Sequence, residues 1–540
     1  METLDVAIVG GGVSGIYTAW RLANATVEEK AEIRSRIGGE GLLRVGVFEA
    51  TDRIGGRLLS ASPSQMPDTV MELGGMRFRT SQQLVTALIS NKLNLASSEQ
   101  TVKGAANQAY LRGHRLPGTA LAGPLADPPY KLTEEELAFL RHPDTGGPSE
   151  LLQWAVAREF PEVADMKGEA LLSFLKTAKV DDEWLYQTGF WNLLSRQLSH
   201  EGRQLALDTI GYDCLGANGN AVDMIMQICD FVPSATYRML DDGFEAVVRR
   251  LADDFDITGE SIRTSHVLES FDRIALPDRH GLRLTFEEGA PVNARVLVLA
   301  LPQAALLALR KKGPVMDPRK ADHVPELLSA VSPTALYKLF IIYDQPWWQD
   351  LGVGEGRALT DIPVRQCYYW ATNPGAPSAI MAYNDQSSAG FWGGYETLLD
   401  RGQDGNMFEG QAEAAADEIE LESSLRYRRL NWRARRAPRD MLREMHHQLM
   451  EMHGVTDAPA PINAAFMDWS DPPYRGAVHF WNPGFRSWDY SRRIIRPVGD
   501  VPAFIIGEAF STDQTWVEGA LQTSEVFLQE HLGIKPPDWL

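Results

Sequence analysis

The chain has 540 residues, of which 44% are hydrophobic and 23% charged, and its formal net charge is −20 at pH 7. A chain of this length exceeds one hydrophobic core, so we expect about three to four domain-sized units. The negative charge excludes general binding to nucleic acid or to an anionic membrane surface. No apolar run of about 18 residues occurs, so we predict no membrane span.

The three cysteines, Cys214, Cys229 and Cys367, form no CxxC pair and have no metal-ligand spacing. They fit free thiols in a reducing compartment better than a disulfide framework, and we predict no metal site. The chain opens directly on a strand-like segment, without the basic and apolar regions of a signal peptide. We therefore expect a cytoplasmic protein.

The first segments predict a βαβ unit. Residues 5–9 form an apolar strand that ends in glycines, and a helix with apolar residues at helical spacing occupies residues 13–23. A charged, helical extension over residues 27–41 precedes a second strand at residues 43–48. The crossover between the two strands is therefore long.

The later segments predict helices first and strands afterwards. Amphipathic helices dominate residues 126–230, and another helix follows from Gly243. Strand patterns recur at residues 265–271, 282–286, 296–301, 337–343 and 379–383. Residues 405–453 indicate a helical stretch whose basic run is a solvated face or an inter-subunit contact. Residues 501–532 repeat the order strand, glycine, helix, so we expect the chain to return to the domain that opened it.

Gly10, Gly12 and Gly15 form a G-x-G-x-x-G motif between the first strand and the first helix. The first glycine permits a tight turn, the second lets a pyrophosphate approach the backbone, and the third lets the helix pack on the strand. The N-terminus of the helix then faces the phosphates. Glu49, at the end of the second strand, can accept the hydroxyls of an unphosphorylated ribose, which favours FAD or NAD over NADP.

The segment TDRIGGRLLS follows directly after Glu49. In it, Arg53 and Arg57 bracket Gly55 and Gly56, so two guanidinium groups lie beside a place where the backbone can be approached closely. Guanidinium groups bind a diphosphate well. We therefore predict that this segment belongs to the same nucleotide site.

These motifs together resemble the flavin amine oxidases, a family of monoamine and polyamine oxidases, L-amino-acid oxidases and tryptophan-monooxygenase-like enzymes. Three later segments extend the resemblance over nearly the whole chain: MELGGMRF at 71–78, LYKLFIIY at 336–343 and IIGEAFSTDQTWVEGALQTSE at 505–525. The helical region and residues 405–453 match least. The resemblance implies FAD as the cofactor, dioxygen and a small molecule as substrates, and a homo-oligomer of two or more subunits.

The implied fold is mixed α/β, with a Rossmann-type FAD-binding domain, an interleaved β-sheet domain for the substrate and a helical domain. The predicted FAD-binding domain comprises residues 1–62, 238–325 and 495–540. The predicted substrate-binding domain comprises residues 63–125 and 326–494, including the helical insert at about 405–453. The predicted helical domain comprises residues 126–237.

Arg77 in MELGGMRF decides the branch of the family. Gly74 and Gly75 bring the backbone close to the flavin ring, and Arg77 then projects a cation into the space over it. An α-carboxylate pairs with that cation and an amine substrate does not. The resemblance to L-amino-acid oxidases implies that Arg77 binds the substrate carboxylate. A tyrosine hydroxyl assists it, either Tyr383 or one of the alternatives Tyr368 and Tyr369.

The resemblance assigns roles to further residues. Lys338, a lysine between apolar strand residues, matches the lysine that holds a water near flavin N5. Glu508 matches the acid that accepts a ribityl hydroxyl. The predicted catalytic residues are Lys338, Arg77, Tyr383 and Trp516. The predicted substrate-binding residues are Arg77, Tyr383, Thr515, Trp516, Asp230 and Val478. The predicted cofactor-binding residues are Gly10, Gly12, Ser14, Gly15, Glu49, Ala50, Arg53, Gly56, Arg57, Gly74, Gly75, Met76, Arg77, Val267, Trp469, Tyr474, Gly507, Glu508, Trp516 and Val517.

We predict oxidative deamination of L-amino acids. Hydride passes from the α-carbon to flavin N5, and the products are a 2-oxo acid, ammonia and hydrogen peroxide. The alternatives are an L-amino-acid 2-monooxygenase that gives an amide, a monoamine or polyamine oxidase, which Arg77 disfavours, and a non-catalytic flavin-binding subunit.

Two sequence features disagree about the preferred substrate side chain. The segment HFWNPG at 479–484 resembles bacterial members of the family that act on basic or other polar amino acids, and Asp230 in a net acidic protein favours a cationic side chain. Trp469, Trp481 and Trp516 favour a large apolar or aromatic one. We expect a basic or polar side chain.

Overall fold

The structure is a computed structural model that describes residues 2–104, 106–213, 217–230, 236–257, 259, 261–309, 313–316, 323–396 and 436–540. The first of its two large sheets has seven strands in the order β12-β2-β1-β15-β14-β13, with β23 beside β15. Five strands of this sheet pair in parallel: β12, β2, β1, β15 and β23. Strand β14 pairs antiparallel with β15, and β13 pairs antiparallel with β14. The strands are β1 (Thr3–Val9), β2 (Val45–Phe48), β12 (Ile262–Arg263), β13 (Leu268–Ala275), β14 (His280–Phe286), β15 (Val292–Leu299) and β23 (Ala503–Ile505).

The second half of β1, Val6 to Val9, is apolar at every position because the first sheet is buried on both faces. Val6 and Ile8 pack in the core that α1, α10 and α17 share, whereas Ala7 and Val9 pack in the core on the opposite face. The helices of this region are α1 (Val13–Ala23), α2 (Val27–Ile37), α10 (Glu245–Phe255), α11 (Gln303–Leu309), α12 (Gly313–Met316), α13 (Val324–Ser329), α16 (Ser487–Arg493) and α17 (Val517–Val526).

The second large sheet has the order β21-β17-β20-β19-β18-β7-β8. Its strands are β7 (Gln108–Leu111), β8 (His114–Pro117), β17 (Leu336–Tyr343), β18 (Arg357–Thr360), β19 (Gln366–Ala371), β20 (Ser378–Asp385) and β21 (Asn463–Asp468). Tyr337 and Leu339 of β17 pack beneath α15 (Arg439–His453), in a core that also contains residues of α14 (Gln386–Gly393). Phe340 and Ile342 pack on the other face, against residues 59–76. Lys338 shares their parity and therefore lies on that second face.

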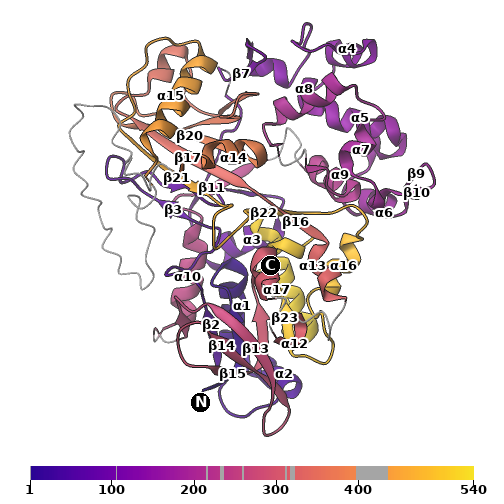
Figure 1. The fold of residues 1–540 in the computed structure, drawn as a ribbon, viewed down its shortest axis with the longest axis vertical. Coiled ribbons are helices and arrows are strands. Elements are labelled where there is room, and N and C mark those ends of the chain that lie inside the picture. Colours follow the sequence, from indigo (N-terminus) through magenta and orange to yellow (C-terminus); the bar gives the residue numbers. More distant parts are fainter. Residues whose placement is uncertain are drawn as a thin grey trace.

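Short strands and a group of helices complete the described fold. The short strands are β3 (Ser60–Ala61), β4 (Met71–Glu72), β5 (Phe78–Arg79), β6 (Ser97–Glu99), β9 (Lys179–Val180), β10 (Glu183–Trp184), β11 (Tyr237–Leu240), β16 (Val331–Thr334) and β22 (Val478–Trp481). The remaining helices are α3 (Gln83–Ala87), α4 (Glu134–Arg141), α5 (Leu151–Glu159), α6 (Gly168–Thr177), α7 (Phe190–Leu194), α8 (His200–Ile210) and α9 (Ala221–Asp230). In Figure 1 the first sheet lies below, α15 and the second sheet lie at the upper left, and α4 to α9 lie at the upper right.

The strands of the first sheet come from residues 1–62, 238–325 and 495–540, and those of the second from residues 63–125 and 326–494. We propose the three predicted domains as the domain organisation of the chain. Some boundaries differ from the prediction for local reasons. Helix α2 ends at Ile37 because Gly38 has φ +73°, and β13 begins only at Leu268, after Ser265 with φ +57°. Of the predicted helical insert, residues 439–453 are helical, whereas residues 405–435 lie outside the described residues.

Candidate active site

A cavity of about 1480 Å³ extends from the glycine motif to the second sheet. This volume exceeds that of a typical drug-sized pocket, about 300–1,000 Å³, so it has room for a dinucleotide and a small substrate together. The cavity wall combines Gly10 and Glu49 from the first sheet region with Lys338 and Tyr383 from the second sheet. The two halves of the chain therefore build one site.

The glycine motif exposes backbone to this cavity. A Cβ atom on Gly15 would lie 2.0 Å from the carbonyl oxygen of Gly10, so the helix packs on the strand only with glycine at this position. Gly12 and Gly56 both line the cavity, and a Cβ on Gly56 would lie 3.0 Å from the Cα of Gly12. Helix α1 begins immediately after Gly12. Its first N–H groups and the bare backbone fit the pyrophosphate of a dinucleotide.

Glu49 lies at the end of β2 as predicted and lines the same cavity. Its carboxylate accepts hydrogen bonds from the backbone N–H of Gly11 at 2.7 Å and from the backbone N–H and side-chain hydroxyl of Thr51, both at 2.8 Å. These three contacts fix the acid beside the glycine motif. Val267 lines the adjoining part of the cavity.

The two arginines after Glu49 occupy different positions. The guanidinium of Arg53 donates to the carbonyls of Ile54, Gly56 and Leu58 and to the hydroxyl of Tyr474, and it lies 3.7 Å from the carboxylate of Glu245. Arg53 is not among the described residues that line the cavity, so it supports the loop from within. Gly15 also lies off the cavity wall, where it serves the helix–strand contact. Arg57 does line the cavity.

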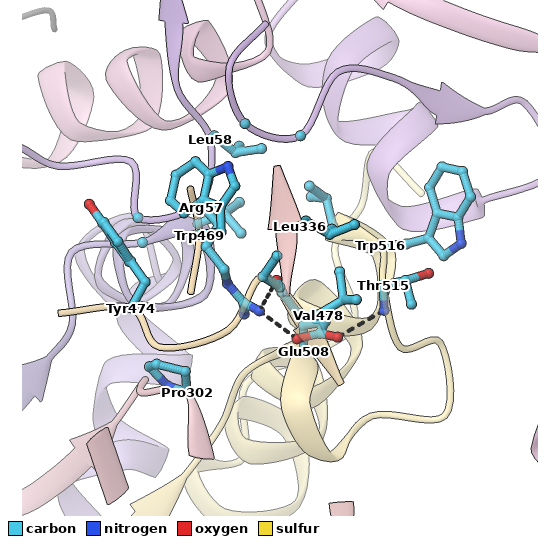
Figure 2. A pocket seen from close by; sticks show the side chains of 18 of the residues that line it. Arg57, Leu58, Pro302, Leu336, Trp469, Tyr474, Val478, Glu508, Thr515 and Trp516 are labelled. Carbon is cyan, nitrogen blue, oxygen red and sulfur yellow. Dashed lines mark hydrogen bonds and ion pairs between the residues drawn. The ribbon is translucent and has the colours of Figure 1, made fainter. Parts of the chain in front are cut away.

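Glu508 forms the centre of a buried polar cluster (Figure 2). Its carboxylate pairs with Arg57 at 2.8 Å and accepts the backbone N–H of Thr515. It also contacts the imidazole Nδ1 of His479 at 2.9 Å and accepts the backbone N–H of that residue. Burial opposes its charge, but Arg57 and His479 nevertheless hold the pKa of Glu508 down at about 2. The sequence analysis missed His479 as part of this cluster, although it lies within HFWNPG.

Lys338 is buried, and its ammonium Nζ donates to the backbone carbonyls of Glu72, at 3.0 Å, and Gly74. Burial is the main cause that lowers the pKa of Lys338 to about 7, and the charge of Arg77 acts in the same direction, against Glu72. The Nζ atom lies 5.0 Å from the centre of the Tyr383 ring. The side chain is therefore held between the ELGG segment and Tyr383, on the cavity wall.

Arg77 lies on the same wall and is 8% exposed. Its guanidinium donates to Gln100 at 3.0 Å and to the Tyr212 hydroxyl at 3.4 Å, and its Cζ atom lies 4.1 Å from the ring centre of Tyr237. No carboxylate of the described residues lies within ion-pair distance of it. A buried guanidinium without a counter-charge is costly, so this position suits an anionic ligand.

The three candidate tyrosines differ in position. Tyr383 lines the cavity and packs edge-on against Tyr212. Tyr368 is buried, and its ring centre lies 6.0 Å from the Cζ atom of Arg77. Tyr369 points to the opposite face of the sheet, where its hydroxyl bonds to His453 on α15. The geometry therefore leaves Tyr383 and Tyr368 near Arg77.

The tryptophans also separate into two kinds. Trp469 and Trp516 line the cavity (Figure 2); the indole N–H of Trp469 donates to the Leu73 carbonyl, and Trp516 stacks on Tyr237. Trp481 is buried in the core beside Phe510 and does not line the cavity in the described part of the chain. Its expected role in favour of an aromatic substrate therefore has no structural support.

Most of the other predicted residues meet in the same cavity. The remaining predicted residues on its wall are Ser14, Ala50, Gly74, Gly75, Met76, Tyr474, Val478, Gly507, Thr515 and Val517. The prediction for Asp230 concerns a side chain outside the described residues. Within the described ranges, no cluster of three or more His, Cys, Asp and Glu side chains could hold a metal ion. No helix in those ranges is long and apolar enough to cross a membrane.

Comparisons with known proteins agree with this geometry. Residues 13–392 match the family model of flavin containing amine oxidoreductases. The chain is 25% identical to Aplysianin-A of Aplysia kurodai over 99% of this chain and 92% of the relative. It is 23% identical to an L-amino acid oxidase of Bothrops pictus, over 72% of this chain and 70% of the relative. A solved putrescine oxidase shares the fold, with a TM-score of 0.65, 16% identity and 98% of each chain covered. The expected fold, family and cofactor are thus confirmed: the chain belongs to the flavin containing amine oxidoreductases, and its cofactor is FAD.

Proposed function

We propose that this protein oxidises L-amino acids to imino acids, with dioxygen reduced to hydrogen peroxide, and that water then hydrolyses the imino acid to a 2-oxo acid and ammonia. The observation that carries the proposal is Arg77, a buried guanidinium on the cavity wall with no carboxylate partner among the described residues. An amine substrate would leave this charge unpaired, whereas an α-carboxylate would neutralise it. The similarity to an L-amino acid oxidase over most of the chain supports the same assignment.

Different residues of the cavity wall bind FAD and the amino-acid substrate. We propose that the glycine motif and α1 hold the pyrophosphate of FAD, that Glu49 accepts its ribose hydroxyls and that the segment around Glu508 holds its ribityl chain. Trp469 and Tyr474, whose rings pack 4.8 Å apart, would flank the ring system. When bound, FAD supplies the two-electron oxidation and the reaction with dioxygen.

The substrate is held by groups of the chain itself. Arg77 pairs with the α-carboxylate, and the hydroxyl of Tyr383 assists, so that the α-carbon has one orientation in the cavity. The backbone of Thr515 and the ring of Trp516 contact the amino-group side. A second enantiomer that keeps the carboxylate on Arg77 would turn its α-hydrogen away, which predicts selectivity for L-amino acids.

A substrate screen tests this proposal. Hydrogen peroxide, ammonia and 2-oxo acid are measured for the twenty L-amino acids, their D-enantiomers and the corresponding decarboxylated amines. We expect turnover of L-amino acids alone. Preferential oxidation of amines would contradict the carboxylate assignment, and an amide product would identify a 2-monooxygenase instead of an oxidase.

Replacement of Lys338 by methionine tests a second assignment. Two of its donors bind carbonyls, and we propose that the remaining one holds a water next to the flavin. Methionine keeps the length and removes the charge, so stopped-flow measurements should show that reoxidation by oxygen slows more than anaerobic reduction by substrate. Equal slowing of both half-reactions, with FAD still bound, would show that Lys338 supports the placement of the cofactor instead.

A further inference from the structure

Two more basic side chains share the cavity with Arg77. Arg357 is the first residue of β18, and Lys103 lies between β6 and β7; both line the cavity. The backbone N–H of Arg357 donates to the carbonyl of Val102 at 3.2 Å, so the loop that carries Lys103 is attached to the start of β18. Arg77, Lys103 and Arg357 therefore line the same cavity, in addition to Arg57, Lys338 and Arg475.

The strand register shows where Arg357 stands relative to the catalytic residues. Lys338 pairs with Tyr383, Tyr383 pairs with Gln366, and Tyr368, two residues further along the same strand, pairs with Arg357. Paired residues on neighbouring strands project to the same face of a sheet. Three strand spacings separate β17 from β18, which places Arg357 about 14 Å from Lys338 across the sheet and, through the two-residue offset, about 7 Å further along the strand direction.

Arg77 and Arg357 both lie near the phenol ring of Tyr368. Their Cζ atoms lie 6.0 Å and 5.9 Å from the centre of the Tyr368 ring. Burial raises the pKa of Tyr368, yet the two guanidinium charges outweigh that effect and lower it. The side chain of Tyr368 therefore lies in a region of net positive charge.

The cations of this part of the cavity lack carboxylate partners. Arg357 donates to the side-chain amide of Gln366, and no carboxylate of the described residues lies within ion-pair distance of Arg357 or Lys103. Partial burial and the charge of Arg357 lower the pKa of Lys103, against Glu150. Of the acids on the described wall, Glu49 and Glu508 are hydrogen-bonded in the cofactor region. Glu287 directly follows β14, where its backbone N–H donates to the carbonyl of Val267, and Glu99 is exposed.

We propose that the substrate is a dicarboxylic L-amino acid, L-glutamate or L-aspartate, with Arg77 on the α-carboxylate and Arg357 on the side-chain carboxylate. Lys103, an exposed side chain on the cavity wall, attracts the doubly anionic substrate. The inference rests on the proposed function and narrows its substrate class. It reverses the expected preference for a basic or polar side chain, because a lysine substrate would place a third cation beside two unpaired guanidinium groups.

The pair glutamate and glutamine provides the sharpest test on the unmodified holoenzyme, since the two substrates have the same size and differ by one charge. We expect kcat/KM for L-glutamate to exceed that for L-glutamine by at least about 10-fold, as one charge-assisted contact predicts. Glutarate, which lacks the amino group, should inhibit competitively with a Ki at least about 10-fold below that of butyrate. These measurements need no variant and remain informative if a variant fails to fold.

Replacement of Arg357 by methionine should remove the preference for L-glutamate over L-glutamine. The ratio of kcat/KM for glutamate to that for glutamine should fall about 10- to 100-fold, mostly through KM, and Arg357→Lys should retain part of it. The control is Arg273→Met, an exposed arginine paired with exposed Asp500, which should leave the ratio unchanged. Because the readout is a ratio, a general loss of active protein does not mimic the effect.

The outcomes separate this inference from the proposed function. If neutral or basic L-amino acids are oxidised faster than glutamate and aspartate, or if glutarate inhibits no better than butyrate, the dicarboxylate assignment is overturned and the oxidase function stands. An unchanged ratio in Arg357→Met overturns it equally. If the FAD-loaded protein releases peroxide from no L-amino acid while glutarate still outcompetes butyrate for binding, measured by calorimetry, the oxidase function fails and the dicarboxylate site remains.

Discussion

Replacing Arg77 by methionine is expected to lower kcat/KM for every L-amino acid substrate by about 30- to 1,000-fold, equivalent to about 2–4 kcal/mol of lost transition-state binding. The guanidinium is buried and its partners in the described chain are the neutral side chains of Gln100, Tyr212 and Tyr237, so the substrate carboxylate supplies the missing charge. Methionine occupies similar space but forms no ion pair. Steady-state rates of peroxide release measure the effect.

The control for this variant is the corresponding amine, which has no carboxylate. Wild-type protein should prefer the amino acid to the amine by a large factor, and Arg77→Met should lose most of that preference. The absorbance spectrum of the purified variant shows whether FAD is still bound. Normal oxidation of amino acids by a variant that contains FAD would show that Arg77 does not bind the carboxylate.

The residues of the nucleotide region could be predicted from the sequence because their geometry is local. Gly12 follows a strand and begins a helix, and Glu49 ends the next strand, so each position follows from one βαβ unit. The same local reasoning placed Arg53 beside a diphosphate. It could not reveal that the side chain turns inward to the carbonyls of its own loop.

The residues of the substrate region depend on contacts between distant segments. Arg357 reaches the cavity because β18 pairs with β19, and His479 reaches Glu508 because β22 lies beside the segment after β23. Arg357 stands in no segment that the sequence analysis singled out, and the HFWNPG segment gives no sign that His479 contacts Glu508. Trp481 shows the opposite error, since an aromatic residue near a motif pointed to the substrate and instead packs in the core.

Neutralising the side chain of Glu508 should strongly destabilise the fold. Glu508 is 5% exposed and contacts Arg57 and the imidazole of His479, so Glu508→Gln keeps the shape of the side chain but leaves Arg57 without its counter-charge. Removing one partner of a buried ion pair destabilises a protein by about 3–5 kcal/mol. We therefore expect a lower urea midpoint and weaker retention of FAD, measured by denaturation followed through tryptophan fluorescence and by flavin release on dialysis.

The pH dependence of the folding stability provides a second test of the contribution of Glu508. The folded-state pKa of Glu508, about 2, lies below its ordinary value of 4.5, so its stabilisation is present above about pH 4.5 and is lost as the pH falls towards 2. Wild-type protein should lose stability over this interval more steeply than Glu508→Gln. Glu201→Gln is the matched control, because Arg112 also lowers the pKa of Glu201 to about 2, but at the surface. The control should change the urea midpoint at neutral pH far less; equal effects of the two variants would show that the buried cluster contributes no more than a surface ion pair.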